Sequence, residues 1–121
     1  MALDGLTIDE SEPTEEKKRA IIEAYLSGDT DYLTEMALEQ EDDGAEVVSL
    51  YLDLLKGTPV TAENIALAVQ AISAISSLPI FAKSDDEERI LTALRVFEGR
   101  AIVKTSDELA KKVAVFGAVK I

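Results

Sequence analysis

An uncharged segment constrains the fold more than any other feature of the chain. Charged residues make up 30% of the sequence, yet none occurs between Asn64 and Ala82. About 20 consecutive apolar residues can span a bilayer. Here, however, Gln70, three serines and Pro79 interrupt the run, and no basic cluster flanks it. We therefore expect a central helix at about 61–77, buried on most sides by neighbouring elements, and no membrane partner.

The rest of the chain carries start and stop signals for further helices. Gly28, Gly44, Gly57 and Gly99 each follow a segment with helical spacing of apolar residues, as expected at helix ends. Ser84–Glu87 and Thr105–Glu108 have the pattern of capping boxes, which mark helix starts. These signals predict helices over 13–27, 29–40, 45–56, 61–77, 84–99 and 106–116. The predicted fold is all-α, a bundle of five to six helices around the central apolar helix.

Two parts of the chain are less regular. Residues 1–12 are rich in acids and lack helical spacing, so we expect a flexible acidic arm followed by one helical domain over 13–121. Valine and isoleucine are concentrated at 101–103 and 113–121, which could be two short strands flanking a helix. The alternative is therefore a helical fold with a small C-terminal β-hairpin. We find no convincing internal repeat at solenoid periods.

Composition excludes several chemistries. The chain has no cysteine and no histidine, so it cannot form a disulfide, a thiolate or ordinary zinc site, or a Ser-His-Asp triad. Hydrophobic residues reach 47% but aromatic residues only 5%, so we expect an aliphatic core. The N-terminus lacks the basic and apolar regions of a secretory signal, which predicts a cytoplasmic protein. We expect no cofactor and no metal site.

The net charge of −12 is confined to one end of the chain. Residues 1–46 contain 15 acids and 3 bases, whereas residues 47–121 contain 9 of each. Charge asymmetry of this kind indicates a charged partner. We therefore predict a non-enzymatic interaction domain, of the inhibitor, immunity, chaperone or accessory type, with an acidic surface for a basic protein. The predicted contact residues are Asp29, Asp31, Glu35, Glu39, Glu41, Asp42 and Asp43.

Two other functions stay open. Paired carboxylates at Glu15-Glu16, at Glu39 with Asp42, and at Glu46 with Asp53 could hold Mg²⁺ in a hydrolase of phosphorylated small molecules. The uncharged segment could instead be the contact of a structural homo-oligomer. Direct nucleic-acid binding is not expected, because the single basic triplet, at 17–19, lies among acids.

Overall fold

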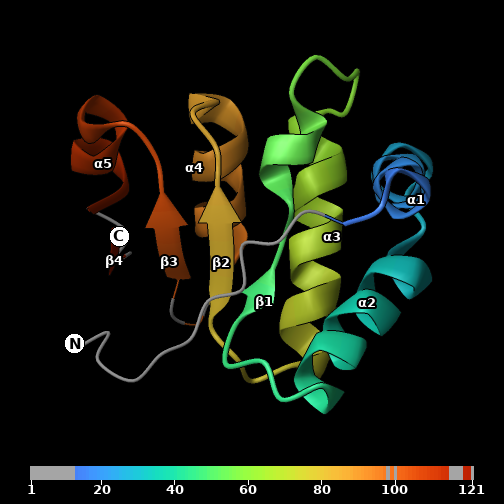
Figure 1. The fold of residues 1–121 in the computed structure, drawn as a ribbon. Helices are drawn as coiled ribbons and strands as arrows, with labels where there is room; N and C mark the ends of the chain where they lie inside the picture. The colour runs from blue at the N-terminus through green and yellow to red at the C-terminus, as the bar shows by residue number, and fades with distance from the viewer. Residues whose placement is uncertain (1–12, 98, 100, 115–118, 121) are drawn as a thin grey trace.

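Four short parallel strands form a sheet whose spatial order, β1-β2-β3-β4, follows their order in the sequence. The computed structural model describes residues 13–97, 99, 101–114 and 119–120 (Figure 1). The strands are β1 (Val48–Ser49), β2 (Ile80–Lys83), β3 (Ala101–Lys104) and β4 (Val119–Lys120). The helices are α1 (Glu15–Ser27), α2 (Thr30–Asp42), the 3₁₀-helix η1 (Leu52–Leu55), α3 (Ala62–Ile75), α4 (Glu87–Val96) and α5 (Asp107–Val113).

The helices pack on one face of the sheet. Crossovers between adjacent parallel strands are right-handed, so a sheet built in sequence order places successive helices on the same side. One large apolar cluster joins residues of all five α-helices to alternate residues of β2 and β3: Ile80, Ala82, Ala101 and Val103. The residues between them point to the other face, where Val47, Phe81 and Ile102 form a separate buried cluster. The sheet is therefore apolar on both faces, as is usual for parallel sheets.

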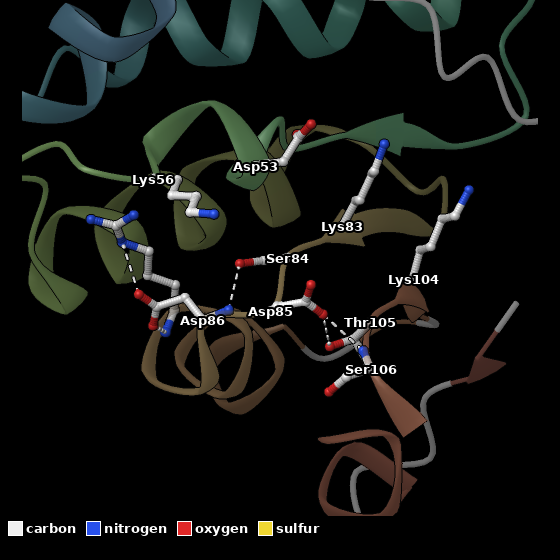
Figure 2. A pocket seen from close by; sticks show the side chains of 10 residues that line it. Asp53, Lys56, Lys83, Ser84, Asp85, Asp86, Lys104, Thr105 and Ser106 are labelled. Carbon is white, nitrogen blue, oxygen red and sulfur yellow. Dashed lines mark hydrogen bonds and ion pairs between the residues drawn. The ribbon is translucent and has the colours of Figure 1, made fainter. Parts of the chain in front are cut away.

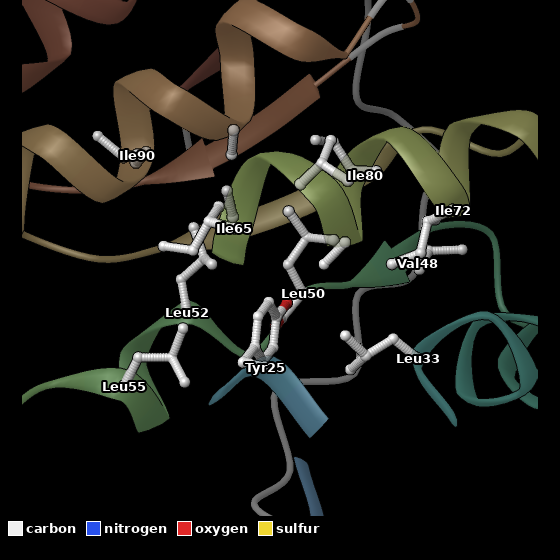
Figure 3. Packing of buried hydrophobic residues seen from close by; sticks show 14 of the residues in the cluster. Tyr25, Leu33, Val48, Leu50, Leu52, Leu55, Ile65, Ile72, Ile80 and Ile90 are labelled. Carbon is white, nitrogen blue, oxygen red and sulfur yellow. The ribbon is translucent and has the colours of Figure 1, made fainter. Parts of the chain in front are cut away.

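The core is aliphatic, as predicted, with one buried phenol at its centre. Figure 3 shows Tyr25 of α1 among leucine and isoleucine side chains from η1, α2 and α3. Tyr25 is completely buried, and its hydroxyl donates a 2.7 Å hydrogen bond to the backbone carbonyl of Leu50, just after β1. This bond ties the first helix to the first strand.

The chain is mostly helical, as the sequence predicted, and several helices begin at the predicted residues. Thr14 caps α1, Asp29 caps α2, and Thr61 forms a reciprocal capping box with Asn64 at the start of α3. Helix α3 contacts α1, α2 and α4, so it occupies the central place expected for the uncharged segment. The all-α prediction is incomplete, however, because the structure also contains a parallel sheet. The predicted arm at 1–12 lies outside the described residues.

The predicted helix over 45–56 is wrong. This segment contains β1 and η1, and Val47 and Val48 point to opposite faces of the sheet. The amides of Val48 and Leu50 donate to carbonyls of the β2 region. The apolar residues recur at helical spacing, but pairing with a strand 32 residues further along the chain determines the local structure.

The C-terminal hairpin is also wrong, although β3 confirms a strand at 101–103 and β4 confirms one within 113–121, with a helix between them. Strands β3 and β4 are parallel, and α5 lies between them in the chain. A hairpin requires antiparallel neighbours joined by a short turn. A helical crossover replaces that turn here.

A side chain completes the hydrogen bonding of the sheet at its β1 edge. The amide of Ser49 donates to Oε1 of Gln40 at 2.9 Å, and Nε2 of Gln40 donates to the Ser49 carbonyl at 3.3 Å. Ser49 is only 9% exposed, so its backbone groups would otherwise lack solvent partners. The carboxamide of α2 thus takes the place that a further strand would occupy.

Replacing this carboxamide should destabilise the protein. Gln40→Ala leaves the amide and carbonyl of Ser49 unpaired, and we expect a loss of about 1–3 kcal/mol in the free energy of unfolding, measured by urea denaturation. Gln70→Ala, at an exposed position of α3, is the matched control and should be neutral because alanine favours helix. Equal stability of the two variants would contradict the role given to Gln40.

Tyr25 should make the fold sensitive to alkali. Burial raises the pKa of the Tyr25 phenol well above its usual value. In the unfolded chain the phenol loses its proton above about pH 10, whereas in the folded chain it stays protonated, so stability falls as the pH rises. We expect Tyr25→Phe to be less stable than wild type at pH 7, but to lose less stability above pH 10. Urea denaturation between pH 7 and about pH 11 measures these changes, with Tyr32→Phe as the control.

Candidate functional site

A cavity of about 600 Å³ opens beyond the carboxyl ends of β1, β2 and β3. Ligands of parallel α/β sheets bind at this edge, because the loops that follow successive strands meet there. Figure 2 shows the lining side chains, which come from η1, from the ends of β2 and β3, and from the start of α4. They are Asp53, Lys56, Lys83, Ser84, Asp85, Asp86, Arg89, Lys104, Thr105 and Ser106.

A backbone turn brings the η1 residues to the cavity. Tyr51, which follows β1, has a φ of 54°, in the left-handed region. Among the described residues, no other non-glycine residue has a positive φ. This conformation costs roughly 1–3 kcal/mol, and it directs the chain sideways into η1, so that Asp53 and Lys56 line the cavity.

The loops after β2 and β3 are joined by hydrogen bonds. Oδ1 of Asp85 accepts from the backbone amide of Ser106 at 2.8 Å and from the hydroxyl of Thr105 at 3.4 Å (Figure 2). The amide of Ser84 donates to the carbonyl of Lys104 at 3.1 Å, which extends the pairing of the two strands into their loops. The two loops therefore form one connected rim.

These bonds also move the helix starts from their predicted positions. The sequence suggested Ser84 and Thr105 as caps, but the N-caps are Asp86 and Ser106. The hydroxyl oxygen of Ser84 accepts from the amide of Asp86 at 3.0 Å, which makes a turn before α4 begins. Ser84 and Thr105 are therefore available to line the cavity.

Arg89 fixes the third side of the cavity. Its guanidinium donates to the carbonyls of Leu55, Thr58 and Val60, which lie in and after η1. Asp86, the α4 cap, lies 3.9 Å from its Nε. The Arg89 side chain is 11% exposed, so the guanidinium connects α4 to the η1 loop from a mostly buried position.

Lys83 and Lys104 occupy equivalent positions in two successive units. They are paired in the register of β2 and β3 and share a face of the sheet with Phe81 and Ile102. Figure 2 shows their side chains extending side by side from the strand ends. Each lysine follows two apolar residues and precedes a serine or threonine, and an Asp-Glu pair opens each following helix.

This short pattern occurs in only two segments, so it does not amount to an internal repeat of the chain. The period is 21 residues and only two units show it, so the signal is weak until the strand register aligns the lysines. Sequence reasoning assigned no role to either residue, because a single lysine at the end of a short apolar segment is not a motif. The sequence signal that could have identified the two lysines is the short pattern around each of them, which occurs twice.

The acids predicted to bind a partner lie away from the cavity. They belong to α2 and its two caps, and α2 ends at the loop before β1, at the opposite end of the strands. Two of the seven have structural bonds: Asp29 caps α2, and Glu41 accepts from the hydroxyl of Ser76 at 3.2 Å. Six of the seven are exposed: Asp29, Asp31, Glu35, Glu39, Asp42 and Asp43. Helix α2 thus displays the predicted acidic surface, and its basic partner stays a prediction.

Three further predictions can be compared with the geometry. In the described part of the chain, no helix combines the length and apolar character needed to cross a bilayer. No three carboxylates there lie close enough together to hold a metal ion. Helix α3 exposes 47% of Leu67 and 43% of Ile75, so a contact between copies through this helix stays a prediction. The cytoplasmic location and the absence of enzymatic activity also stay predictions.

Comparison of the chain with family models, with curated proteins and with solved structures finds no match. Inference about function therefore rests on the geometry of the molecule. The cavity and its rim bring together polar side chains from three segments of the chain.

Removing the Arg89 guanidinium should loosen the η1 side of the cavity. Hydrogen bonds from a charged donor contribute about 1.5–3 kcal/mol, so we expect Arg89→Met to lower the free energy of unfolding by about 2–4 kcal/mol in urea denaturation. The backbone amides of residues 55–58 and of Val60 should exchange faster with deuterium. Arg95→Met, at an exposed position in the last turn of α4, is the control. Wild-type exchange at 55–60 in the Arg89 variant would contradict this role.

Proposed function

We propose that the protein binds a small molecule in the cavity at the carboxyl ends of β1, β2 and β3. The observation that carries the proposal is the convergence of polar and charged side chains from three successive strand–loop segments on one cavity. A single charged side chain at one strand end would be explained by ordinary solvent exposure. Ten lining residues from three segments make a binding site the better explanation.

The size of the cavity supports this proposal. Small-molecule sites usually have volumes of about 300–1,000 Å³ and contain a few convergent polar groups. The cavity of about 600 Å³ lies within that range. Its position agrees with the general rule for open parallel sheets, in which ligands bind outside the carboxyl ends of the strands.

The rim is also organised before any ligand binds. Asp85 joins the loops after β2 and β3, and Arg89 holds the η1 loop from α4. A ligand that enters therefore orders few additional groups, which lowers the entropic cost of binding. The geometry favours a binding module or the substrate site of an enzyme, and the side chains alone do not require catalysis.

Blocking the cavity should abolish binding. We expect small soluble fragments bearing hydroxyl, amide or carboxylate groups to shift the amide resonances of Ser84, Asp85, Thr105 and Ser106 in ¹H–¹⁵N spectra. Lys56→Trp places a bulky ring in the cavity and should weaken the best fragment at least tenfold. Lys111→Trp, on α5 and outside the lining, is the matched control. Shifts that map to another surface, or equal affinity in both variants, would refute the proposal.

The acidic face of α2 supports a second, separate proposal, that of a basic protein partner. Helix α2 contains no lysine or arginine, and with its caps it carries six exposed acids. Fixed charges of one sign on a rigid helix increase association rates with a partner of the opposite sign, most strongly at low salt. Its test is binding of a lysine-rich peptide at 20 and 150 mM salt, compared with the variant Glu39→Gln, Asp42→Asn, Asp43→Asn. Equal binding by both proteins would refute it.

A further inference from the structure

The second face of the sheet is buried more completely than the described elements explain. Val47, Phe81 and Ile102 point away from the helices, yet they are only 5%, 3% and 0% exposed. Within the described part of the chain their cluster contains no other buried residue, and the helices pack against the opposite face (Figure 1). Neighbours in a sheet shield a side chain from the sides only, because a covering layer lies about 10 Å above the sheet. These exposures are those of residues beneath a further layer.

The covering layer belongs to this chain, because the three residues are buried within a single chain. Outside the described residues, the longest stretch is 1–12, and the next longest, 115–118, has four residues and joins α5 to β4. Twelve extended residues reach up to about 40 Å, whereas β1 and β3 lie only about 10 Å apart. Residues 1–12 are therefore long enough to cross this face.

The N-terminal segment carries the side chains that such a layer requires. Leu6 and Ile8 are separated by Thr7, so an extended backbone directs both apolar side chains to one side and the hydroxyl to the other. This alternation is typical of a segment that is buried on one side only. Leu3 adds a third apolar side chain. Removal of these side chains from water favours their packing on an apolar face.

The charges of the segment have the sign that this face attracts. Residues 1–12 contain four acids and no base. Lys83 and Lys104 continue the face beyond Phe81 and Ile102. Both lysines have interaction partners, but attraction between opposite charges extends over about 8 Å at physiological salt and does not require a free ammonium group. Charge therefore favours this face over the acidic surface of α2.

We propose that residues 3–8 lie in an extended conformation across the second face of the sheet, with Leu6 and Ile8 against Phe81 and Ile102. The segment is then a layer of the fold and not a free acidic tail. This inference is independent of the cavity and its ligand. It also leaves α2 as the acidic surface available to a basic protein.

A spin label at residue 7 tests the position of the segment. The chain has no cysteine, so Thr7→Cys gives a single labelling site in the full-length protein. We expect the label to reduce the ¹H–¹⁵N peak intensities of Phe81 and Ile102 at least by half, relative to the same sample with the label reduced. The amides of α3, on the other side of the sheet, should lose less intensity. Broadening confined to residues 13–20 would overturn the proposal.

Two further samples identify the contact and the chain that makes it. The additional changes Leu6→Ser and Ile8→Ser should restore the intensities of Phe81 and Ile102, whereas the matched control, Ala2→Ser with Ser11→Ala, should not. Unchanged broadening in the first variant would contradict the assignment to Leu6 and Ile8. The label alone decides the position of the segment even if that variant does not fold.

The last sample mixes spin-labelled protein without ¹⁵N and unlabelled protein with ¹⁵N. No broadening of Phe81 or Ile102 is expected in this mixture, because the covering segment belongs to the same chain. Broadening as strong as in the single sample would assign the layer to a second copy and overturn the proposal.

Discussion

The parallel pairing of β2 with β3 is the interaction on which the rest of the structure depends. Four consecutive residue pairs, from Ile80 with Ala101 to Lys83 with Lys104, set the register. A shift of one residue would reverse the faces and move Lys83 into the interface with the helices. The same register sends Phe81 and Ile102 to the second apolar face and brings the two lysines together at the strand ends. The register of β2 and β3 therefore determines which residues enter the core, which form the cavity rim and where the two lysines lie.

The sequence predicted the helices better than the strands, and the physical reason is locality. Thr14, Asp29 and Thr61 are caps because their side-chain oxygens accept from amides three residues further along the chain. Such interactions depend on adjacent residues alone. Strand β1 has two residues, and its partner lies beyond η1 and α3, so no local pattern identifies it. The apolar residues of 45–56 fit a helical spacing equally well, and the sheet pairing determines the outcome.

The candidate site was predicted less well than the fold. Charge asymmetry directed attention to acids such as Glu39 and Asp42, which stand exposed on and beside α2. The cavity instead uses lysines from the part of the chain with no net charge. A balanced composition does not reveal which cations the strand pairing brings close together. Lys83 and Lys104 lie 21 residues apart in the sequence, and only the register makes them neighbours.

The pairing of Gln40 with Ser49 has a consequence for self-association. An open strand edge is a template on which another chain can add a strand and begin an aggregate. At β1 the carboxamide of Gln40 is hydrogen-bonded to that edge. Glu39 and Glu41 flank Gln40 in the sequence. Two copies that approached along this edge would meet a blocked backbone and charges of the same sign. Charged residues beside a strand edge disfavour pairing between two such edges.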